Sequence, residues 1–467
     1  MANSSVTRRA FAGAGAATAA AQFFAGTSLA TETGKMQTQA LQKMIDACHA
    51  SGGGTVIVPP GNHVCGTLYL RSDVELRLSS GARILGSHNP ADYPAAARSG
   101  LDVHYRSRAL LVAEDAANIA VTGYGLIDGR GSPEFFPAVH SGDEDQRPKL
   151  MRVLNCRNVT LRDIDLRNSA SWGCQFINSE QIRIDAITMD SRLNSNNDGL
   201  DLDGCRDVWI SNCRLTTGDD AICPKSTLRA TENVVITNCI LSSRTAAFKL
   251  GTSSAGGFRN ITLTNCVFRD CKLGAIKILC VDGGIVENIL VSDVIMDQVE
   301  GPIFIRLGSR GLRYEKTEEA NKLHNPAEDW TRINGSNSTG VLRHVTLRNI
   351  RATVASTDLA CWGIMISGVP GYRIQDLVLQ DIDVSFPGGG TAADAHRVVP
   401  EDEKRYPEEK FFGALPCWGL YMRHVEDVSL ENVRLRLRSP DARPGFYEED
   451  TSRVRKLRCE FLDPGVW

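Results

Sequence analysis

The chain has 467 residues, of which 42% are hydrophobic and 6% aromatic, and it carries a formal net charge of −3. This balance lacks the basic footprint that nucleic-acid binding requires. No apolar stretch of about 18 residues runs without polar interruption, which argues against a membrane anchor. We therefore expect a protein that binds neither nucleic acid nor membrane and that acts as a monomer.

The first 30 residues are typical of an export signal. Ser5 to Phe11 (SVTRRAF) resembles the twin-arginine motif, a weakly apolar Ala/Gly stretch follows, and Ser28-Leu29-Ala30 offers a small-residue cleavage site. A flexible, Ala-rich tail is the alternative. Removing residues 1–30 leaves 50 basic and 55 acidic side chains, a net charge of −5. We predict a periplasmic or extracellular protein with one mature domain, residues 31–467.

Residues 38–50 predict a short amphipathic helix after the signal. Its apolar side carries Ala40, Leu41, Met44, Ile45 and Cys48. Such a helix would cover the first turn of a repeating fold, whose strand edges would otherwise be exposed. Residues 52–61 (GGGTVIVPPG) then predict turn, strand and turn. Further strands are expected at residues 68–70, 74–78 and 82–85.

A short unit recurs from residue 118 onward and begins with Asx or a related polar residue. Examples are NVTLRDIDL from 158, QIRIDAITM from 181, DVWISNCRL from 207, NVVITNCIL from 233, NITLTNCVF from 260 and NILVSDVIM from 288. The successive starts step by 23, 26, 26, 27 and 28 residues. Each unit alternates with period two, as strands do. A turn of this length holds three short strands, too few for a propeller blade, so the repeat predicts a parallel β-helix.

The cysteines support stacking of the repeats. Cys213, Cys239 and Cys266 occupy the same slot in three consecutive units, which should form a ladder along the axis. The chain has 14 cysteines but no Cys-x-x-Cys pair and no zinc-type histidine spacing. We interpret most of them as small buried hydrophobic residues.

Three aspartates fall close to one turn of the repeat apart. Asp198 lies in NNDGLD, and Asp219 and Asp220 follow 21 residues later in Gly218-Asp219-Asp220. Neighbouring like charges push at least one pKa upward, and a raised carboxyl pKa suits general-acid chemistry near neutral pH. An isolated Gly-Asp-Asp is more often an acidic turn. The third aspartate favours a catalytic centre.

Several motifs together resemble a known family. They are GGGTVIVPPGNHVCGTLYL, GARILGSHNPADYP, YGLIDGRG, NNDGLDLDGC and TTGDDAI, with YPEEKFFGALPCWGLYMRHV further on. The combination is similar to glycoside hydrolase family 28, the polygalacturonases and their relatives, from about residue 36 to at least residue 310. The resemblance implies an all-β fold, a right-handed single-stranded parallel β-helix. It also implies inverting hydrolysis of pectic backbones, with no cofactor and no metal.

By position, the resemblance makes Asp198, Asp219 and Asp220 the catalytic residues. An inverting glycosidase needs a protonated carboxyl at the leaving oxygen and a carboxylate that holds water on the opposite face. Asp219 would be the acid. Asp198 and Asp220 would be ionised, orient the water and raise the pKa of Asp219 by repulsion. Asp201 and Asp203 either shape the same cleft or are turn and strand-surface groups.

The chain departs from the family where polygalacturonases bind galacturonate. Asn197 replaces a threonine, and residues 245–247 (TAA) stand where the family has Gly-His-Gly. Residues 275–277 (AIK) stand where it has Arg-Ile-Lys when the register is anchored on Gly283-Gly284. In polygalacturonases these cations bind the substrate carboxylate next to the cleavage point. Their loss predicts weaker binding of a uronate there.

Other side chains could take over substrate binding. The predicted substrate-binding residues are Lys249, Lys277, Arg306 and Trp172, with Lys225 and Arg310 as further candidates. A lone cation is more often a solvated surface charge. Trp172 could stack on a sugar face or pack in a loop. Segments 310–339 and 387–410 are expected to form walls of the cleft, but the sequence does not decide between exo and endo action.

Three functions compete at this point. The favoured one is an exported polygalacturonase-like glycosidase acting on a pectic poly- or oligosaccharide. The second is a polysaccharide lyase of the same architecture, with calcium held by Asp198, Asp201 and Asp203, and the Gly-Asp-Asp match argues against it. The third is a non-catalytic carbohydrate-binding β-helix, which the retention of all three predicted catalytic aspartates disfavours.

Overall fold

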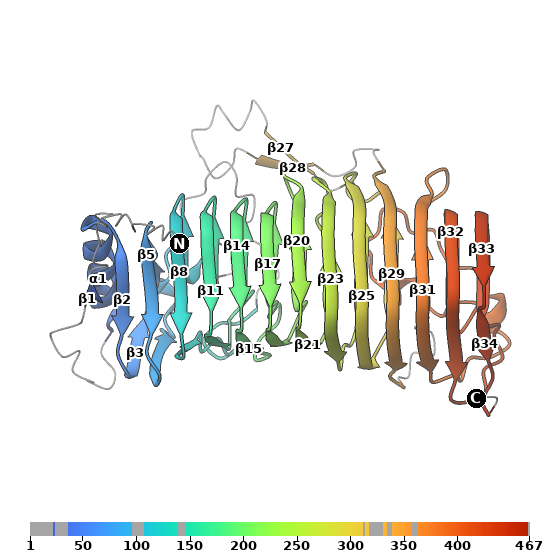
Figure 1. Ribbon diagram of the computed structural model, residues 1–467, viewed down its shortest axis with the longest axis horizontal. Helices are drawn as coiled ribbons and strands as arrows, with labels where there is room; N and C mark the ends of the chain where they lie inside the picture. The colour runs from blue at the N-terminus through green and yellow to red at the C-terminus, as the bar shows by residue number, and fades with distance from the viewer. Residues whose placement is uncertain are drawn as a thin grey trace, which may run out of the picture.

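The computed structural model describes residues 36–95, 107–138, 146–311, 339–356 and 363–465, and the backbone of 22–23, 313–316 and 330–333. The predicted export signal lies outside the described residues apart from strand β1 (Gln22–Phe23). The chain forms an elongated solenoid in which successive turns stack along one axis (Figure 1). All pairings of the main sheet are parallel, which confirms the predicted parallel β-helix.

Each turn contributes a strand to each of three faces. The first face contains β2 (Gly54–Val58), β5 (Val74–Leu78), β8 (Ala117–Gly123), β11 (Arg157–Arg162), β14 (Glu180–Asp185), β17 (Arg206–Ser211), β20 (Thr231–Thr237), β23 (Phe258–Arg269), β25 (Ile285–Val299), β29 (Val341–Val354), β31 (Ile374–Phe386), β32 (Leu420–Leu437) and β33 (Phe446–Leu457). The second face contains β3 (Gly61–Cys65), β6 (Ala82–Gly86), β9 (Leu126–Asp128), β12 (Asp165–Arg167), β15 (Thr188–Ser191), β18 (Arg214–Thr217), β21 (Ile240–Ser243) and β34 (Glu460–Leu462), joined by the C-terminal parts of β23, β25, β29, β31 and β32.

The third face carries the candidate site. It contains β4 (Leu68–Tyr69), β7 (Ala109–Glu114), β10 (Lys149–Leu154), β13 (Cys174–Ile177), β16 (Leu200–Asp203), β19 (Ile222–Lys225), β22 (Ala246–Leu250), β24 (Gly274–Cys280), β26 (Ile303–Leu307) and β30 (Ile364–Ser367), with the N-terminal ends of β32 and β33. Short 3₁₀ helices η1 (Pro90–Asp92), η4 (Asp394–His396) and η5 (Glu409–Phe412) lie in loops. Strands β27 (Arg313–Lys316) and β28 (Trp330–Ile333) form a separate antiparallel pair.

The polar residue at the head of each repeat turns the chain into the first face. Asn158, Asn233, Asn260 and Asn288 all have φ between 54° and 58°, in the left-handed region that asparagine tolerates. The side-chain amide of Asn260 donates to Asn233 Oδ1 and that of Asn288 to Asn260 Oδ1, both at 3.0 Å. The recurring Asx in the sequence therefore marks a corner and ties one turn to the next.

Alternation along each strand places aliphatic side chains inside the coil. In β20, Val234 and Ile236 are fully buried while Val235 between them is exposed. In the next turn, Ile261 and Leu263 fill the same two slots. Each such burial contributes about 1.5–3 kcal/mol. The core is therefore a series of aliphatic ladders along the axis.

The cysteine ladder is present as predicted. The residues that follow Cys213 and Cys239, namely Arg214 and Ile240, are paired across adjacent turns, and Ile240 is paired with Val267, which follows Cys266. All three cysteines are buried. Every cysteine in the part of the chain that the structure describes is a free thiol, and all but Cys459 are buried. This confirms their interpretation as small core residues.

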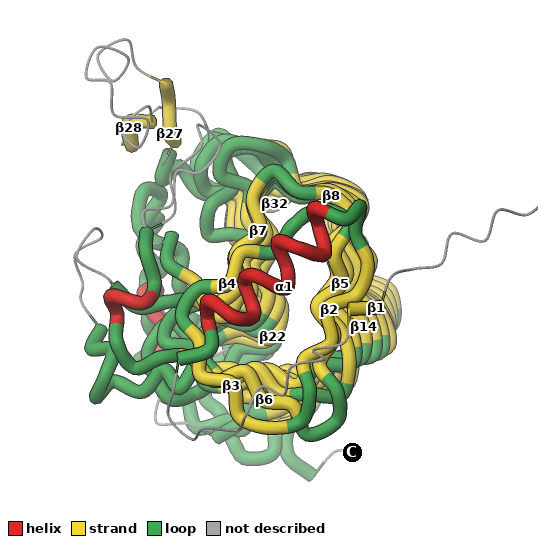
Figure 2. The backbone as a smooth tube through the Cα atoms, turned by 90° about the vertical axis from the view of Figure 1, so that its left-hand side faces the viewer, coloured by secondary structure: helices red, strands yellow, loops and turns green. Residues whose placement is uncertain are grey.

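Helix α1 (Thr38–Ala50) has the bounds that the sequence predicts and lies across the N-terminal end of the coil (Figure 2). Leu41, Ile45 and Cys48 are buried against the first turn, whereas Ala40, predicted for the same side, is exposed. The helix covers apolar core and strand edges that would otherwise face solvent. Of the helices in the described ranges, none combines the length and apolar character that a membrane crossing requires.

Candidate active site

Stacking of the third face brings the three predicted catalytic aspartates together. Asp198 lies two residues before β16, and Asp219 and Asp220 precede β19 in the next turn. The backbone N–H of Gly199 donates to the carbonyl of Asp220 at 2.8 Å, which aligns the two loops. Carboxylate oxygens of all three residues lie within 4.8 Å of one another. The sequence separation of one turn is therefore converted into direct proximity.

Asn197 holds the loop that presents Asp198. This side chain is fully buried, donates to the carbonyls of Ser169 and Ser171, and accepts from the backbone N–H of Asn194. The backbone carbonyl of Asn197 also accepts from the N–H groups of Gly218 and Asp219, each at 3.1 Å. Asn197 therefore ties three separate segments together at the base of the loop that carries Asp198.

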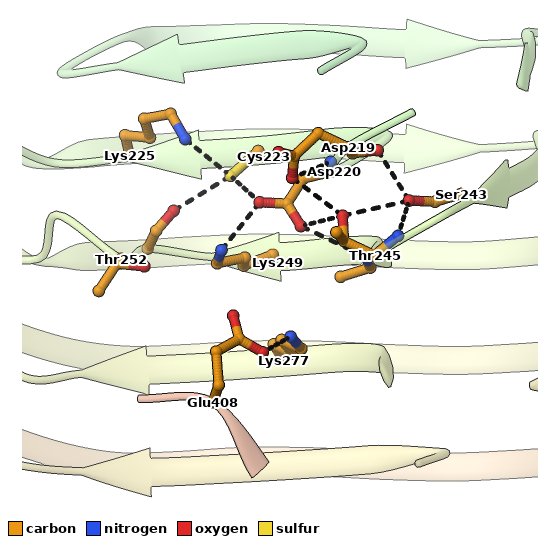
Figure 3. Close-up of polar contacts among 12 residues, drawn as sticks. Asp219, Asp220, Cys223, Lys225, Ser243, Thr245, Lys249, Thr252, Lys277 and Glu408 are labelled. Carbon is orange, nitrogen blue, oxygen red and sulfur yellow. Dashed lines mark hydrogen bonds and ion pairs between the residues drawn. The ribbon is translucent and has the colours of Figure 1, made fainter. Parts of the chain in front are cut away.

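Asp220 is held in its ionised form. Lys249 Nζ lies 2.8 Å from its Oδ2, while Thr245 Oγ1 donates to Oδ1 at 2.9 Å (Figure 3). Burial alone would raise the pKa of Asp220, but the positive charges of Lys249, Lys225 and Lys277 lower it well below its usual range. Asp220 is therefore the carboxylate suited to act as a base.

Asp219 has the opposite electrostatic environment. Burial raises its pKa, and the negative charge of Asp220 raises it further, against opposing effects of Lys249 and Thr245. Thr245 Oγ1, whose single proton is donated to Asp220, lies 3.0 Å from Oδ1 of Asp219, whereas Oδ2 has a long contact of 3.4 Å from the amide of Asn196. The carboxyl predicted to be the acid thus has a raised pKa, mainly because of burial.

Asp198 differs from its expected state. Burial raises its pKa well above the usual value, and the negative charges of Asp201 and Asp219 add to this effect. Asp201 is itself fully buried and lies 3.1 Å from Lys225 Nζ, and burial raises its pKa to about 6 against that ion pair. Burial and the neighbouring negative charges therefore oppose the ionised form that was expected for Asp198.

The predicted lysine contacts are already occupied by protein carboxylates. Strand pairing sets Lys249 next to Lys277 in the following turn. Lys277 is fully buried and its Nζ lies 2.5 Å from Glu408. Lys249, as described, is paired with Asp220. Both lysines lie beside the acids, but they balance protein charge rather than point freely into a cleft.

Two further cations are also engaged. Arg306, predicted to bind substrate, is fully buried and donates to Ser367 Oγ and to the carbonyls of Gly368 and Glu401. This is a correction, since its hydrogen bonds fasten a loop to the third face. Arg310 Nη2 lies 2.5 Å from Asp282. Both cations are therefore committed to protein groups.

Trp172 lies beside the acids as predicted. The backbone N–H of Gly173, the next residue, donates to the carbonyl of Asp198 at 2.8 Å. The half-buried indole is flanked by Lys149 and Lys225, whose Nζ atoms lie 5.2 and 4.9 Å from the ring centroid. Both ammonium groups orient the ring by cation–π attraction. Its stacking on a sugar stays a prediction.

Sequence reasoning missed three members of the site. Thr245 contacts both Asp219 and Asp220, yet its segment stood out only for lacking the family's histidine. Tyr406 and Glu408 reach Lys249 and Lys277 from more than 130 residues away. The segment 387–410 was nevertheless expected as a wall, and its C-terminal part packs on this face. Most of segment 310–339 lies outside the described residues.

Comparison with known proteins agrees with this geometry. The model of the glycosyl hydrolases family 28 matches residues 48–398. The chain belongs to this family. It is 29% identical to an exo-poly-alpha-D-galacturonosidase of Dickeya chrysanthemi, over 40% of this chain and 39% of that protein. A probable polygalacturonase of Vitis vinifera is 28% identical over 53% and 54%. The chain thus spans about half or less of these relatives' length.

Among solved structures, an exopolygalacturonase from Thermotoga maritima superposes with a TM-score of 0.57 at 22% identity. The match covers 75% of this chain and 85% of that one. At this identity the likeness establishes the shared β-helix fold and nothing finer.

The Lys249–Asp220 pair yields a prediction about pH. In Lys249→Met, Asp220 stays buried but loses the positive charge that does most to lower its pKa. The pKa of Asp220 should therefore rise, and the acid limb of the pH–activity profile should move to higher pH. Breaking a buried pair from one side should cost about 3–5 kcal/mol near neutral pH. Below the unfolded-state pKa of about 3.9, the wild type progressively loses the stability that ionised Asp220 provides.

The variant should therefore lose less stability than the wild type between neutral pH and about pH 3. The free energy of unfolding, measured by chemical denaturation at neutral pH and at about pH 3, tests the stability change. The pH–activity profile tests the shift of the acid limb. The control is Lys272→Met, which removes an exposed lysine 3.5 Å from Glu300. An acid limb that stays at the wild-type position in Lys249→Met would contradict the assigned charge of Asp220.

Proposed function

We propose that the protein is an exported glycoside hydrolase that cleaves a glycosidic bond in a pectic poly- or oligosaccharide. One observation carries this proposal: in a chain of family 28, Asp219, with a raised pKa, adjoins Asp220, with a lowered pKa, and carboxylate oxygens of both lie within 4.8 Å of each other and of Asp198. Hydrolysis needs such a division of roles between two carboxyl groups.

In the proposed reaction Asp219 Oδ2 donates its proton to the glycosidic oxygen as the bond from that oxygen to the anomeric carbon breaks. A water molecule attacks the anomeric carbon and transfers a proton toward Asp220. The neutral form of Asp198 allows three carboxyl groups to share so small a volume, because only one negative charge then remains among them. Thr245 keeps Asp219 and Asp220 in fixed relative orientation.

Inversion at the anomeric carbon is the outcome we propose on the ground of family membership. The separation within 4.8 Å among the carboxylate oxygens counts against it, since the carboxyl groups of inverting enzymes are typically about 6.5–9.5 Å apart. Retention would require a carboxylate nucleophile and a covalent intermediate. The configuration of the first product decides between the two.

The site favours a substrate other than plain polygalacturonate. Lys225, Lys249 and Lys277 are each balanced by a protein carboxylate. By contrast, Ser171 Oγ and both amide atoms of Gln175 are buried without a hydrogen-bond partner among the described residues. Uncommitted neutral polar groups suit sugar hydroxyls better than a carboxylate. We propose a branched or mixed pectic fragment as the preferred substrate.

The lyase alternative has less support. Calcium was expected from Asp198, Asp201 and Asp203, but Asp203 accepts hydrogen bonds from Thr227 N and Oγ1, and Asp201 pairs with Lys225. The ammonium group of Lys225 thus occupies the position at which a lyase of this kind would need to bind calcium.

A substrate panel tests hydrolysis, substrate and stereochemistry together. The mature protein is incubated with oligogalacturonides and rhamnogalacturonan fragments, and products are identified by mass and by proton NMR of the new anomeric centre. We expect added water, initial inversion and low efficiency on oligogalacturonides, because two charge-assisted bonds worth about 1.5–3 kcal/mol each are missing. Unsaturated products would indicate a lyase, and no product a binding protein. A kcat/KM near 10⁶ M⁻¹s⁻¹ or above on oligogalacturonides, which is on the order of the upper range for enzymes, would contradict the substrate proposal.

Asp219→Asn tests the proton donor. The substitution removes the proton and little packing, so turnover should fall by about 10² to 10⁴ while the fold is kept. Steady-state rates on a substrate with a poor leaving group, with circular dichroism as the fold control, measure this. The matched control is Asp203→Asn, whose carboxylate binds Thr227 away from the reacting atoms. Activity above about a tenth of wild type in Asp219→Asn rules out the acid role.

Export rests on the twin-arginine motif at Arg8-Arg9 and is proposed on that ground. Replacing both arginines by lysine keeps the charge but removes the motif, so the protein should accumulate inside the cell. Fractionation of cells that express the full chain, compared with Arg162→Lys as an exposed control, measures the shift. Equal export of both variants would contradict the route.

A further inference from the structure

The segment Val399–Phe412 folds back onto the third face beyond the active acids, and it follows the last family-matched residue, 398. Arg423 donates to the carbonyls of Val399 and Pro400, and Arg306 to that of Glu401. The N–H of Ser309 donates to the carbonyl of Glu403 at 2.7 Å. These contacts fix the N-terminal part of the segment, and the Lys277–Glu408 ion pair fixes the part further on.

The same segment covers the outward-facing side chains of the C-terminal turns. One outward column of the third face runs from Lys277 through Phe304 and Met365 to Tyr421. From Phe304 onward these side chains are fully buried, in a cluster with Val399, Phe412, Leu415 and Cys417. This part of the face is therefore sealed by protein and offers no surface to a polysaccharide.

The seal begins close to the acids. Asp219 and Asp220 head β19, Lys249 lies on β22 in the next turn, and Lys277 on β24 is already covered by Glu408. Adjacent strands are about 4.8 Å apart, so the covered turn starts only about 10 Å beyond the acids. This length corresponds to one or two sugar units.

Tyr406 stands at the rim of the seal. Its hydroxyl lies 2.9 Å from Thr252 Oγ1 and 3.5 Å from Lys249 Nζ. Lys249 and Arg310 both lie 5.8 Å from its ring centroid. Although held by these contacts, the residue is 45% exposed. An aromatic ring that is fixed in position and half open to solvent beside an acid cluster suits the apolar face of a sugar.

We propose that Val399–Phe412 forms an end wall of the substrate groove, so that the enzyme acts at chain ends, and that Tyr406 binds the terminal sugar at that wall. The inference rests on the proposed hydrolysis and adds its mode and a specificity-determining residue. A polymer can enter only from the N-terminal side of the face, and every cleavage releases a short product of constant length.

The experiment uses the full mature chain with an oligosaccharide ladder and the corresponding polymer of the class hydrolysed in the substrate panel. The wild type should release one short product from the earliest times, with little loss of viscosity. Tyr406→Ala should raise KM by about tenfold and change kcat less, because the ring contributes binding rather than proton transfer. Tyr406→Phe, which keeps the ring, should remain near the wild-type KM.

Tyr372→Ala, which removes a 48% exposed tyrosine from a turn elsewhere, is the matched control and should leave KM unchanged. Products of mixed length at early times, with a rapid fall in viscosity, would overturn the end wall. Equal KM values for Tyr406→Ala and the control would overturn the role of Tyr406. Absence of any hydrolysis by the wild type would instead contradict the proposed function, and the inference would fall with it.

Discussion

The whole molecule depends on the parallel hydrogen-bond register between consecutive turns. Once that register is set, residues about 26 positions apart become neighbours about 4.8 Å apart. The same rule produces the asparagine corners, the cysteine ladder and the aliphatic core. It also brings Asp198 to Asp220, because the N–H of Gly199 bonds to the carbonyl of Asp220. A one-residue slip in this strand pair would turn the outward side chains into the core.

A crowded acid cluster imposes a second constraint, namely charge balance in a buried volume. Relatives are expected to supply cations that meet the substrate carboxylate. In this chain Lys249 neutralises Asp220 and Lys225 neutralises Asp201, so both lysines are committed before any substrate arrives. Burial then raises the pKa of Asp198 and of Asp219. The lysines of this site thus balance the charge of the chain's own buried acids.

Structural features that follow from the sequence repeat were predicted correctly, whereas contacts made by non-repeating segments were missed. Period-two alternation, the 26-residue spacing and the amphipathic pattern of residues 38–50 were sufficient for the β-helix and its cap. The clustering of Asp198, Asp219 and Asp220 followed from the same spacing. The ionisation of Asp198 and the role of Arg306 did not, because both depend on burial by neighbours that no local pattern reveals. Tyr406 and Glu408 lie in the YPEEKFF motif, but the loop that holds it has no periodicity, so their contacts with Lys249 and Lys277 could not be predicted from the sequence.

That loop also explains why cations near the acids take structural roles. Lys277 is fully buried because Glu408 covers it, and Arg306 is fully buried because the carbonyl of Glu401 lies over it. A solenoid with an open third face presents the same surface at every turn and would let a polymer lie along its full length. The segment Val399–Phe412 packs on the C-terminal turns, so these turns no longer present the same open surface as the others. Substrate length on that side is then limited by the first turn that the loop covers, that of Lys277, and only the turn of Lys249 separates it from the acids.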